Sequence, residues 1–143
     1  MSEQDNIRIA EEIFEALNAR DLSRASQHQA PGYTFEAPGL PGPVGPDEEA
    51  AYLQGFLDAF PDLHFELTHK IAQGDFVVTN WVGTGTHEGP LRTPSGDSLP
   101  ATGRKGANFG SNTMEFENGK VVRNRSYWDM VAFLAQLGVM PGM

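Results

Sequence analysis

The main change in the pattern of apolar residues along the chain comes near residue 63. Before that point apolar residues recur at helical spacing, and after it β-branched and aromatic residues alternate with polar ones. Helices that are followed by a run of antiparallel strands and a closing helix predict an α+β fold. At 143 residues, the chain corresponds most simply to a single domain over residues 1–143.

Three helices are predicted before the change. The first covers Ile7 to Leu17, with Asp5 or Asn6 as its cap, and the second covers Leu22 to Gln29. A short strand, Tyr33 to Glu36, and a loop rich in Gly and Pro over 38–46 follow the second helix. Asp47 caps the third helix, and Glu48 and Glu49 suit its positive N-terminal turn. Its buried stripe is Leu53, Phe56, Leu57 and Phe60.

The second half of the chain is predicted to form the sheet. Alternating patterns indicate strands over 63–67, 76–87, 107–117 and 120–129. Asn118-Gly119 is a strong hairpin signal between the last two strands. The closing helix runs from Met130 to Leu137, and Gly138 ends it.

Asp129 lies at the junction of the last strand and the closing helix. On strand geometry without a bulge, Arg125, Tyr127 and Asp129 share one face, whereas Asn124, Ser126 and Trp128 share the other. If the first face is the inner one, the Asp129 carboxyl lies in a low-dielectric pocket and its pKa rises toward the range of a general base. Asp is also a good helix N-cap, so both interpretations stay open.

Composition excludes several classes of function. The net charge of −9 argues against nucleic acid, anionic membranes and polyanionic substrates, all of which need a positive field. The absence of Cys excludes disulfides and thiolate chemistry. The polar N-terminus is unlike a signal peptide, and no apolar run approaches the roughly 20 residues of a membrane span. We therefore expect a cytoplasmic protein.

Several short phrases occur in the order seen in one family. The phrases are Phe60-Pro61-Asp62-Leu63, Gly74-Asp75, Gly85-Thr86-His87-Glu88-Gly89, Pro100-Ala101-Thr102-Gly103-Arg104, Asn118-Gly119-Lys120-Val121-Val122, Trp128-Asp129 and Gln136-Leu137-Gly138. In these phrases the chain resembles the SnoaL-like polyketide cyclases of the NTF2-like superfamily, and the resemblance extends from the first helix to Gly138.

The resemblance implies a cone-shaped α+β barrel, in which a curved antiparallel sheet wraps around helices and encloses an apolar cavity. It also implies an enzyme of anthracycline-type biosynthesis that closes a ring by an intramolecular aldol reaction, with no metal or organic cofactor. Asp129 matches the family's single acid/base residue. The substrate would be a small aromatic polyketide.

Other residues are candidates for assisting this chemistry. His87, which matches the Gly-Thr-His phrase, could orient Asp129 or a substrate oxygen, or serve only as a structural hydrogen-bonding residue. Asn108 and Asn112 share one strand face and need partners if buried. Aromatic side chains suited to a flat substrate are Phe14, Tyr33, Phe35, Phe56, Trp81 and Tyr127. No spacing among His28, His64 and His69 predicts a metal site.

Two other functions remain open alongside the cyclase. Some SnoaL-like proteins are implicated in hydroxylating anthracyclines, and the Asn-rich run Asn108 to Asn112 could mark that reaction. NTF2-like domains also serve as non-catalytic binding modules. We further expect a homodimer, because the outer sheet face carries apolar residues such as Val78, Val82 and Val122.

Overall fold

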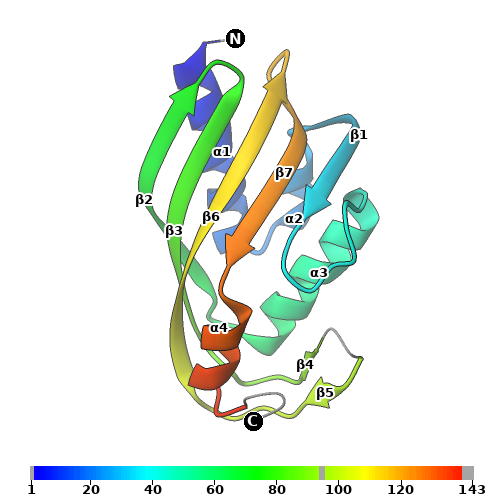
Figure 1. The fold of residues 1–143 in the computed structure, drawn as a ribbon, viewed down its shortest axis with the longest axis vertical. Coiled ribbons are helices and arrows are strands. Elements are labelled where there is room, and N and C mark those ends of the chain that lie inside the picture. The colour runs from blue at the N-terminus through cyan, green and yellow to red at the C-terminus, as the bar shows by residue number, and fades with distance from the viewer. Residues whose placement is uncertain (1, 94–95, 140–143) are drawn as a thin grey trace.

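The computed structural model describes residues 2–93 and 96–139, which form four helices and seven strands within these ranges. Figure 1 shows a long curved sheet with α1, α2 and α3 on one side and α4 at its lower end. The elements are α1 (Glu3–Asn18), α2 (Leu22–Ser26), β1 (Gln29–Glu36), α3 (Pro46–Ala59), β2 (His64–Gln73), β3 (Phe76–Thr86), β4 (Leu91–Arg92), β5 (Ser98–Leu99), β6 (Lys105–Glu117), β7 (Lys120–Trp128) and α4 (Met130–Gln136).

The main sheet has the strand order β1-β7-β6-β3-β2. All its neighbouring strands are antiparallel except β1 and β7, which pair in parallel. The α+β prediction is confirmed, and the expectation of a wholly antiparallel sheet is wrong at this edge. Asn118 and Gly119 have φ values of 50° and 78°, as the predicted tight hairpin between β6 and β7 requires.

A β-bulge interrupts the alternation of side chains in β7. Phe116 of β6 pairs with Val121, but the preceding residue Glu115 pairs with Arg123, so Val122 is an extra residue in β7. Val121 and Asn124 are therefore both buried although they are three positions apart. From Asn124 onward the even-numbered residues face inward and the odd-numbered ones face outward.

The core lies between the inner face of the sheet and the helices. Its buried cluster joins Ala10 and Phe14 of α1 to Val77 of β3 and Met114 and Phe116 of β6. The end of α1 is fixed to the edge strand β2, because the Asn18 side chain donates to the Phe65 carbonyl and accepts from the Phe65 amide. These two hydrogen bonds fix the position of α1 relative to the sheet.

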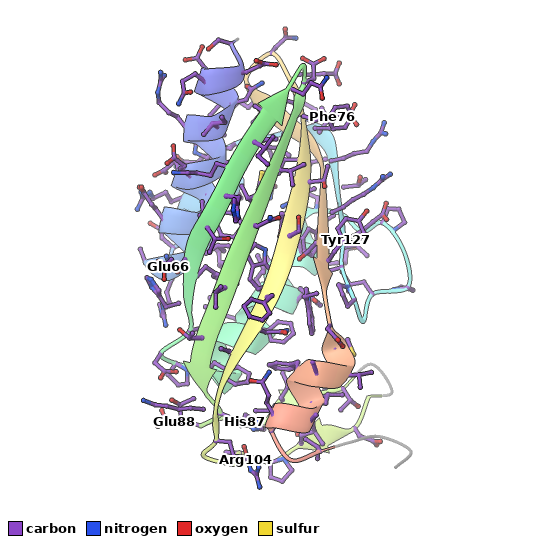
Figure 2. All side chains as sticks on the ribbon, turned by 60° about the vertical axis from the view of Figure 1, so that its left-hand side comes forward. Glu66, Phe76, His87, Glu88, Arg104 and Tyr127 are labelled. Atoms are coloured by element: carbon purple, nitrogen blue, oxygen red, sulfur yellow. The ribbon has the colours of Figure 1, made fainter. Side chains whose placement is uncertain are left out.

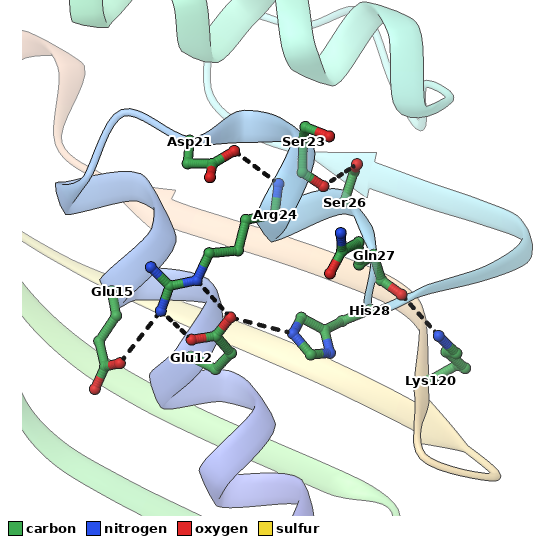
Figure 3. Close-up of polar contacts among 9 residues, drawn as sticks. All are labelled: Glu12, Glu15, Asp21, Ser23, Arg24, Ser26, Gln27, His28 and Lys120. Carbon is green, nitrogen blue, oxygen red and sulfur yellow. Dashed lines mark hydrogen bonds and ion pairs between the residues drawn. The ribbon is translucent and has the colours of Figure 1, made fainter.

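Charged contacts hold the short helix α2 against α1. The Arg24 guanidinium binds the Glu12 carboxylate, with Nε 2.8 Å from Oε2, and lies 3.6 Å from Glu15 (Figure 3). Beside it, Lys120 of β7 donates to the Gln27 carbonyl over 2.7 Å. These contacts position α2, which forms part of the cavity wall described below.

The bounds of three helices differ from the sequence prediction, two at the start and one at the end. Ser2, rather than Asp5 or Asn6, caps α1, because the Ser2 and Asp5 side chains bind each other's backbone amides in a capping box. Gly45 caps α3 and Pro46 takes its first position, where proline loses no hydrogen bond, so the predicted Asp47 cap is wrong. The predicted second helix is three residues too long, since Gln29 already belongs to β1.

Candidate active site

A cavity of about 160 Å³ lies between the inner face of the sheet and helices α1 to α4. Most of its wall is apolar, and aromatic rings contribute from every side. Edge-to-face pairs link these rings, as in Phe65 with Trp81 and Phe56 with Trp128. Such a wall suits a flat, apolar ligand. The aromatic lining residues are Phe14, Tyr33, Phe35, Tyr52, Phe56, Phe60, Phe65, Trp81, Trp128 and Phe133.

Most of the candidate binding residues from the sequence line this cavity. They are Phe14, Tyr33, Phe35, Phe56, Trp81, Asn108 and Asn112. The shared inward face of Asn108 and Asn112 is confirmed, since both border the cavity and Met114 and Phe116 follow on the same face. The structure brings these residues together, and whether they bind a substrate stays a prediction.

Three side chains in the cavity form a connected hydrogen-bonded group. The Trp81 indole Nε1 donates to Asn112 Oδ1 over 2.8 Å, and Asn112 Nδ2 donates to Asn124 Oδ1 over 2.8 Å. The two buried asparagines therefore have protein partners, as buried amides require.

Glu49 belongs to a second hydrogen-bonded group in the cavity and is only 6% exposed. Its Oε2 accepts from the Tyr33 hydroxyl over 2.8 Å and its Oε1 accepts from Gln29 Nε2 over 2.9 Å. Burial raises the pKa of Glu49 to about 7, and the two donors hold that pKa below the value that burial alone would give. Burial and the Glu49 charge raise the pKa of Tyr33, which therefore stays protonated.

Sequence reasoning placed Glu49 in the first turn of the third helix, which is confirmed, but missed its inward direction. The signal was present in the helical spacing. Glu49 precedes Leu53 by four positions and Phe56 by seven, so it continues the predicted buried stripe. A carboxylate on a buried stripe is a candidate functional group, because it is costly to bury without a purpose.

Asp129 and Tyr127 lie outside the cavity. Tyr127 is 56% exposed on the outer face of β7 (Figure 2), and Asp129 is also exposed. Asp129 Oδ1 accepts from the Ala132 amide over 2.9 Å and caps α4. The expectation that the face of Asp129 is the inner one is wrong, because the bulge at Val122 reverses which residues face inward. The capping interpretation is confirmed.

His87 is fully buried just beyond β3, and it is not a lining residue of the cavity. Its ring stacks on Phe60 at 5.3 Å, and its Nδ1 lies 3.0 Å from Thr102 Oγ1. Its backbone pairs with Arg104 and Gly103, so it fixes the turn below the sheet (Figure 2). Burial lowers the pKa of His87 and outweighs the opposing effect of the Gly89 backbone. This placement favours the structural interpretation.

Among residues 2–93 and 96–139, no group of three or more His, Asp or Glu side chains could hold a metal ion. No helix in the same ranges combines the length and apolar character needed to cross a membrane.

Solved structures share this architecture. AclR, a putative hydroxylase from Streptomyces galilaeus, is 27% identical, with a TM-score of 0.85 over 99% of this chain and 86% of its own. IdmH, a putative polyketide cyclase from Streptomyces antibioticus, is 27% identical, with a TM-score of 0.79 over 94% of this chain and 99% of its own. An NTF2-like protein from Burkholderia pseudomallei, 22% identical, matches at a TM-score of 0.76 over 96% of this chain and 98% of its own.

The curved sheet, the helices on its inner side and the cavity between them define an NTF2-like α+β domain. The model of the SnoaL-like polyketide cyclases matches residues 7–137. The chain therefore belongs to the SnoaL-like polyketide cyclase family. A comparison with curated proteins finds no match.

Proposed function

We propose that the protein closes a ring of an aromatic, anthracycline-type polyketide by intramolecular aldol condensation in the cavity. Membership of the family and the aromatic walls support a flat polyketide as the substrate. The observation that carries the reaction type is Glu49, the only carboxyl among the described residues that line the cavity. A carboxyl with a pKa of about 7 can both accept and return a proton at neutral pH.

In the proposed reaction the Glu49 carboxylate takes a proton from the carbon next to a substrate carbonyl. The resulting enolate carbon attacks a second carbonyl carbon of the same molecule, and a carbon–carbon bond forms. The attacked carbonyl oxygen then receives the proton from the Glu49 carboxylic acid. The net change is an isomerisation without oxidation, so the reaction itself requires neither a metal nor an organic cofactor.

The cavity would supply the remaining acceleration by fixing the geometry of the flexible substrate. Rings on opposite walls, such as Trp81 and Phe56, can hold a flat aromatic system between them. Holding the enolate carbon near the second carbonyl removes much of the entropic cost of bringing the two reacting carbons together. A carbanion that is conjugated with a polycyclic aromatic system needs only a modest base.

The placement of Glu49 leads us to prefer it to Asp129 as the acid/base residue. The resemblance assigns this role to Asp129, and that assignment stays a prediction. The Asp129 side chain is exposed and already accepts a hydrogen bond from the backbone of α4. To reach the cavity, the Asp129 carboxylate would have to break its hydrogen bond to the Ala132 amide.

The test is the mass of an anthracycline precursor after incubation with the purified protein in air, without added cofactor. We expect an isomer of unchanged mass, and its rate of formation should rise through pH 7 as Glu49 loses its proton. Tight binding of the precursors without any product would instead identify a binding module. That outcome would overturn the enzymatic proposal.

Hydroxylation is the second candidate. It is favoured by the likeness to AclR and by the polar inner face of β6, where Asn108 and Asn112 border the cavity. A product that has gained one oxygen atom in the same experiment would establish this reaction. A carbon–carbon bond formed at unchanged mass would exclude it for that precursor.

We also propose that two copies pair through the outer face of the sheet. Phe109 of β6 is 77% exposed there, and Phe76 and Tyr127 are exposed on neighbouring strands (Figure 2). Apolar rings on one sheet face commonly mark an interface. Light scattering should give twice the chain mass, and Phe109→Glu should halve it. A monomeric wild-type protein at micromolar concentration would refute the pairing.

A further inference from the structure

The orientation of the Asn124 amide is fixed by two hydrogen bonds that begin at Trp81. An indole N–H can only donate, so the Asn112 atom that faces Trp81 must be its oxygen. The Asn112 nitrogen then donates to Asn124 Oδ1 over 2.8 Å. Because the Asn124 oxygen faces Asn112, its nitrogen points elsewhere. Within residues 2–93 and 96–139, no acceptor forms a hydrogen bond with Asn124 Nδ2.

The Trp81 ring that starts this arrangement is held by its neighbours. Gly110 of β6 pairs with Trp81, and a Cβ at position 110 would lie 2.1 Å from Trp81 Cζ2. Phe65 closes the ring from another side at 5.1 Å, edge to face. The indole therefore lies against the bare Gly110 backbone with its N–H toward Asn112.

Asn124 combines deep burial with access to the cavity. Its side chain belongs to a residue that is 7% exposed, and it forms part of the cavity wall. A buried amide N–H without an acceptor is costly, so buried donors are nearly always paired. A buried donor that borders a cavity therefore predicts an acceptor atom on the ligand of that cavity.

Asn124 and Glu49 border the same part of the cavity. Asn124 pairs with Phe35 of β1, and Tyr33 lies two residues earlier on the same buried face. Tyr33 gives its hydroxyl proton to Glu49 over 2.8 Å. Burial raises the pKa of Tyr33 and Asn124 opposes that rise, so the two side chains lie close together although no hydrogen bond joins them.

We propose that Asn124 is a catalytic residue whose amide N–H groups bind the oxygen of the substrate carbonyl that is converted to an enolate. Glu49 takes the proton from the neighbouring carbon, the electron pair of that C–H bond forms a C=C bond, and the carbonyl electron pair moves onto oxygen. Asn124 donates hydrogen bonds to this oxygen and loses no proton. Trp81 and Asn112 are positioning residues that turn the Asn124 nitrogen toward the cavity.

The inference rests on the proposed function, because it assigns the oxygen-binding group of the same reaction. The enolate oxygen carries a negative charge, and the described residues that line the cavity include no Lys, Arg or His. Neutral donors must therefore stabilise that charge. Fixed donors act most strongly on charge that develops during the reaction, so Asn124 should bind the enolate more tightly than the ketone.

The first measurement compares the binding of 2-indanone and indane to the full-length protein by fluorescence titration. Both are small flat bicyclic molecules, and only 2-indanone has a carbonyl oxygen. The wild type should bind the ketone more tightly than the hydrocarbon. In Asn124→Leu the ratio of the two affinities should fall about fivefold, as expected for loss of one hydrogen bond.

The second measurement follows the exchange of hydrogen for deuterium at the carbon next to the carbonyl of 2-indanone in D2O. This exchange reports proton removal without requiring a polyketide. Asn124→Leu should slow exchange in the bound ketone by about 10²-fold, the usual effect of removing one donor to a developing oxyanion. The fall in rate should exceed the fall in affinity, and a merely structural role would not produce that difference.

Ser126→Ala is the matched control. Ser126 lies two residues further along β7 on the same inner face and also borders the cavity, but it takes no part in the hydrogen-bonded group. The affinity ratio and the exchange rate should both stay at the wild-type values. Trp81→Phe keeps Asn124 but removes the donor that orients Asn112, so it should lower the affinity ratio less than Asn124→Leu does. If Asn124→Leu does not fold, this fall in Trp81→Phe alone decides the matter.

A wild-type protein that does not bind the ketone more tightly than the hydrocarbon would overturn the inference. So would an unchanged affinity ratio in Asn124→Leu, or an equal fall in Ser126→Ala. Failure of the proposed function looks different. In that case no polyketide is cyclised and no deuterium exchange is catalysed, while the preference for the ketone still depends on Asn124. That result would support Asn124 as the carbonyl-binding group and refute Glu49 as the base.

Discussion

The inner and outer faces of β7 differ in what they do for the molecule. On the inner face, Asn124 and Trp128 border the cavity and belong to its polar and aromatic walls. On the outer face, Arg125 pairs loosely with Glu36 at 3.5 Å, and Tyr127 is exposed. Asp129 follows the strand and caps α4. One strand thus carries cavity chemistry on one side and surface and capping roles on the other.

The comparison extends to two carboxyls, each at the start of a helix. Glu49 lies in the first turn of α3 and is buried in the cavity, where its pKa rises to about 7. Asp129 precedes α4, is exposed and binds a backbone amide. Both positions favour an anion through the helix dipole. Only the buried one combines that position with a cavity, which is what proton transfer to a ligand needs.

Exchange of each carboxyl for its amide should give the largest contrast. Glu49→Gln should lower kcat/KM for ring closure by about 10²–10⁴-fold, the usual contribution of a general acid/base. Asp129→Asn should leave kcat/KM near the wild-type value, since Asn is an equally good N-cap and α4 is preserved. Product formation under steady-state conditions measures both.

The reverse result would restore the assignment to Asp129 that the resemblance implies. Loss of turnover in Asp129→Asn, with Glu49→Gln still active, would require Asp129 to reach the substrate. Circular dichroism of both variants controls for misfolding. The two substitutions each remove one ionisable group and change size very little, so they form a matched pair.

Sequence alone could predict the elements because their patterns are local. Helical spacing located α1, and alternation located β3 and β6. The alternation in β7 correctly separated Asn124, Ser126 and Trp128 from the residues between them. It could not tell which set faces the cavity, because one extra residue reverses the two faces and Val122 supplies that residue only through its pairing with β6.

In the candidate site, too, local features could be predicted from the sequence and long-range contacts could not. Aromatic residues that share a face with core positions, such as Trp81 and Phe56, could be found from spacing. The link between Glu49 and Tyr33 could not, because it joins α3 to β1, which pairs with β7 in parallel. Long-range contacts of this kind depend on topology, and the predicted sheet was wholly antiparallel.

The pH dependence of the free energy of unfolding should give the second-largest difference between Glu49 and Asp129. The folded-state pKa of Glu49 is raised from 4.5 to about 7, so its favourable contribution is complete below pH 4.5 and is lost as the pH rises through 7. The loss can reach about 3 kcal/mol by pH 9. Glu49→Gln should therefore gain stability relative to wild type as the pH rises, as measured by urea unfolding.

Asp129→Asn provides the comparison for this measurement. Its unfolding free energy should follow that of the wild type across the same pH range, because Glu49 is intact in it. A Glu49→Gln variant whose stability stays parallel to that of the wild type would mean that Glu49 is ionised in the fold at acidic pH. The acid/base proposal would then lose its titrating group.

The smallest expected effect is that of removing the cap. Asp129→Ala should lower the free energy of unfolding by about 1 kcal/mol, because the Ala132 amide loses its acceptor. Asp129→Ser should recover most of that loss, since Ser also caps helices well. A loss far above this value, or no recovery with Ser, would show that Asp129 does more than cap α4. Because α4 contributes Phe133 and Gln136 to the cavity wall, a frayed α4 should also weaken substrate binding. The Ser variant separates that indirect effect from any direct role, because it restores the helix without restoring a carboxyl.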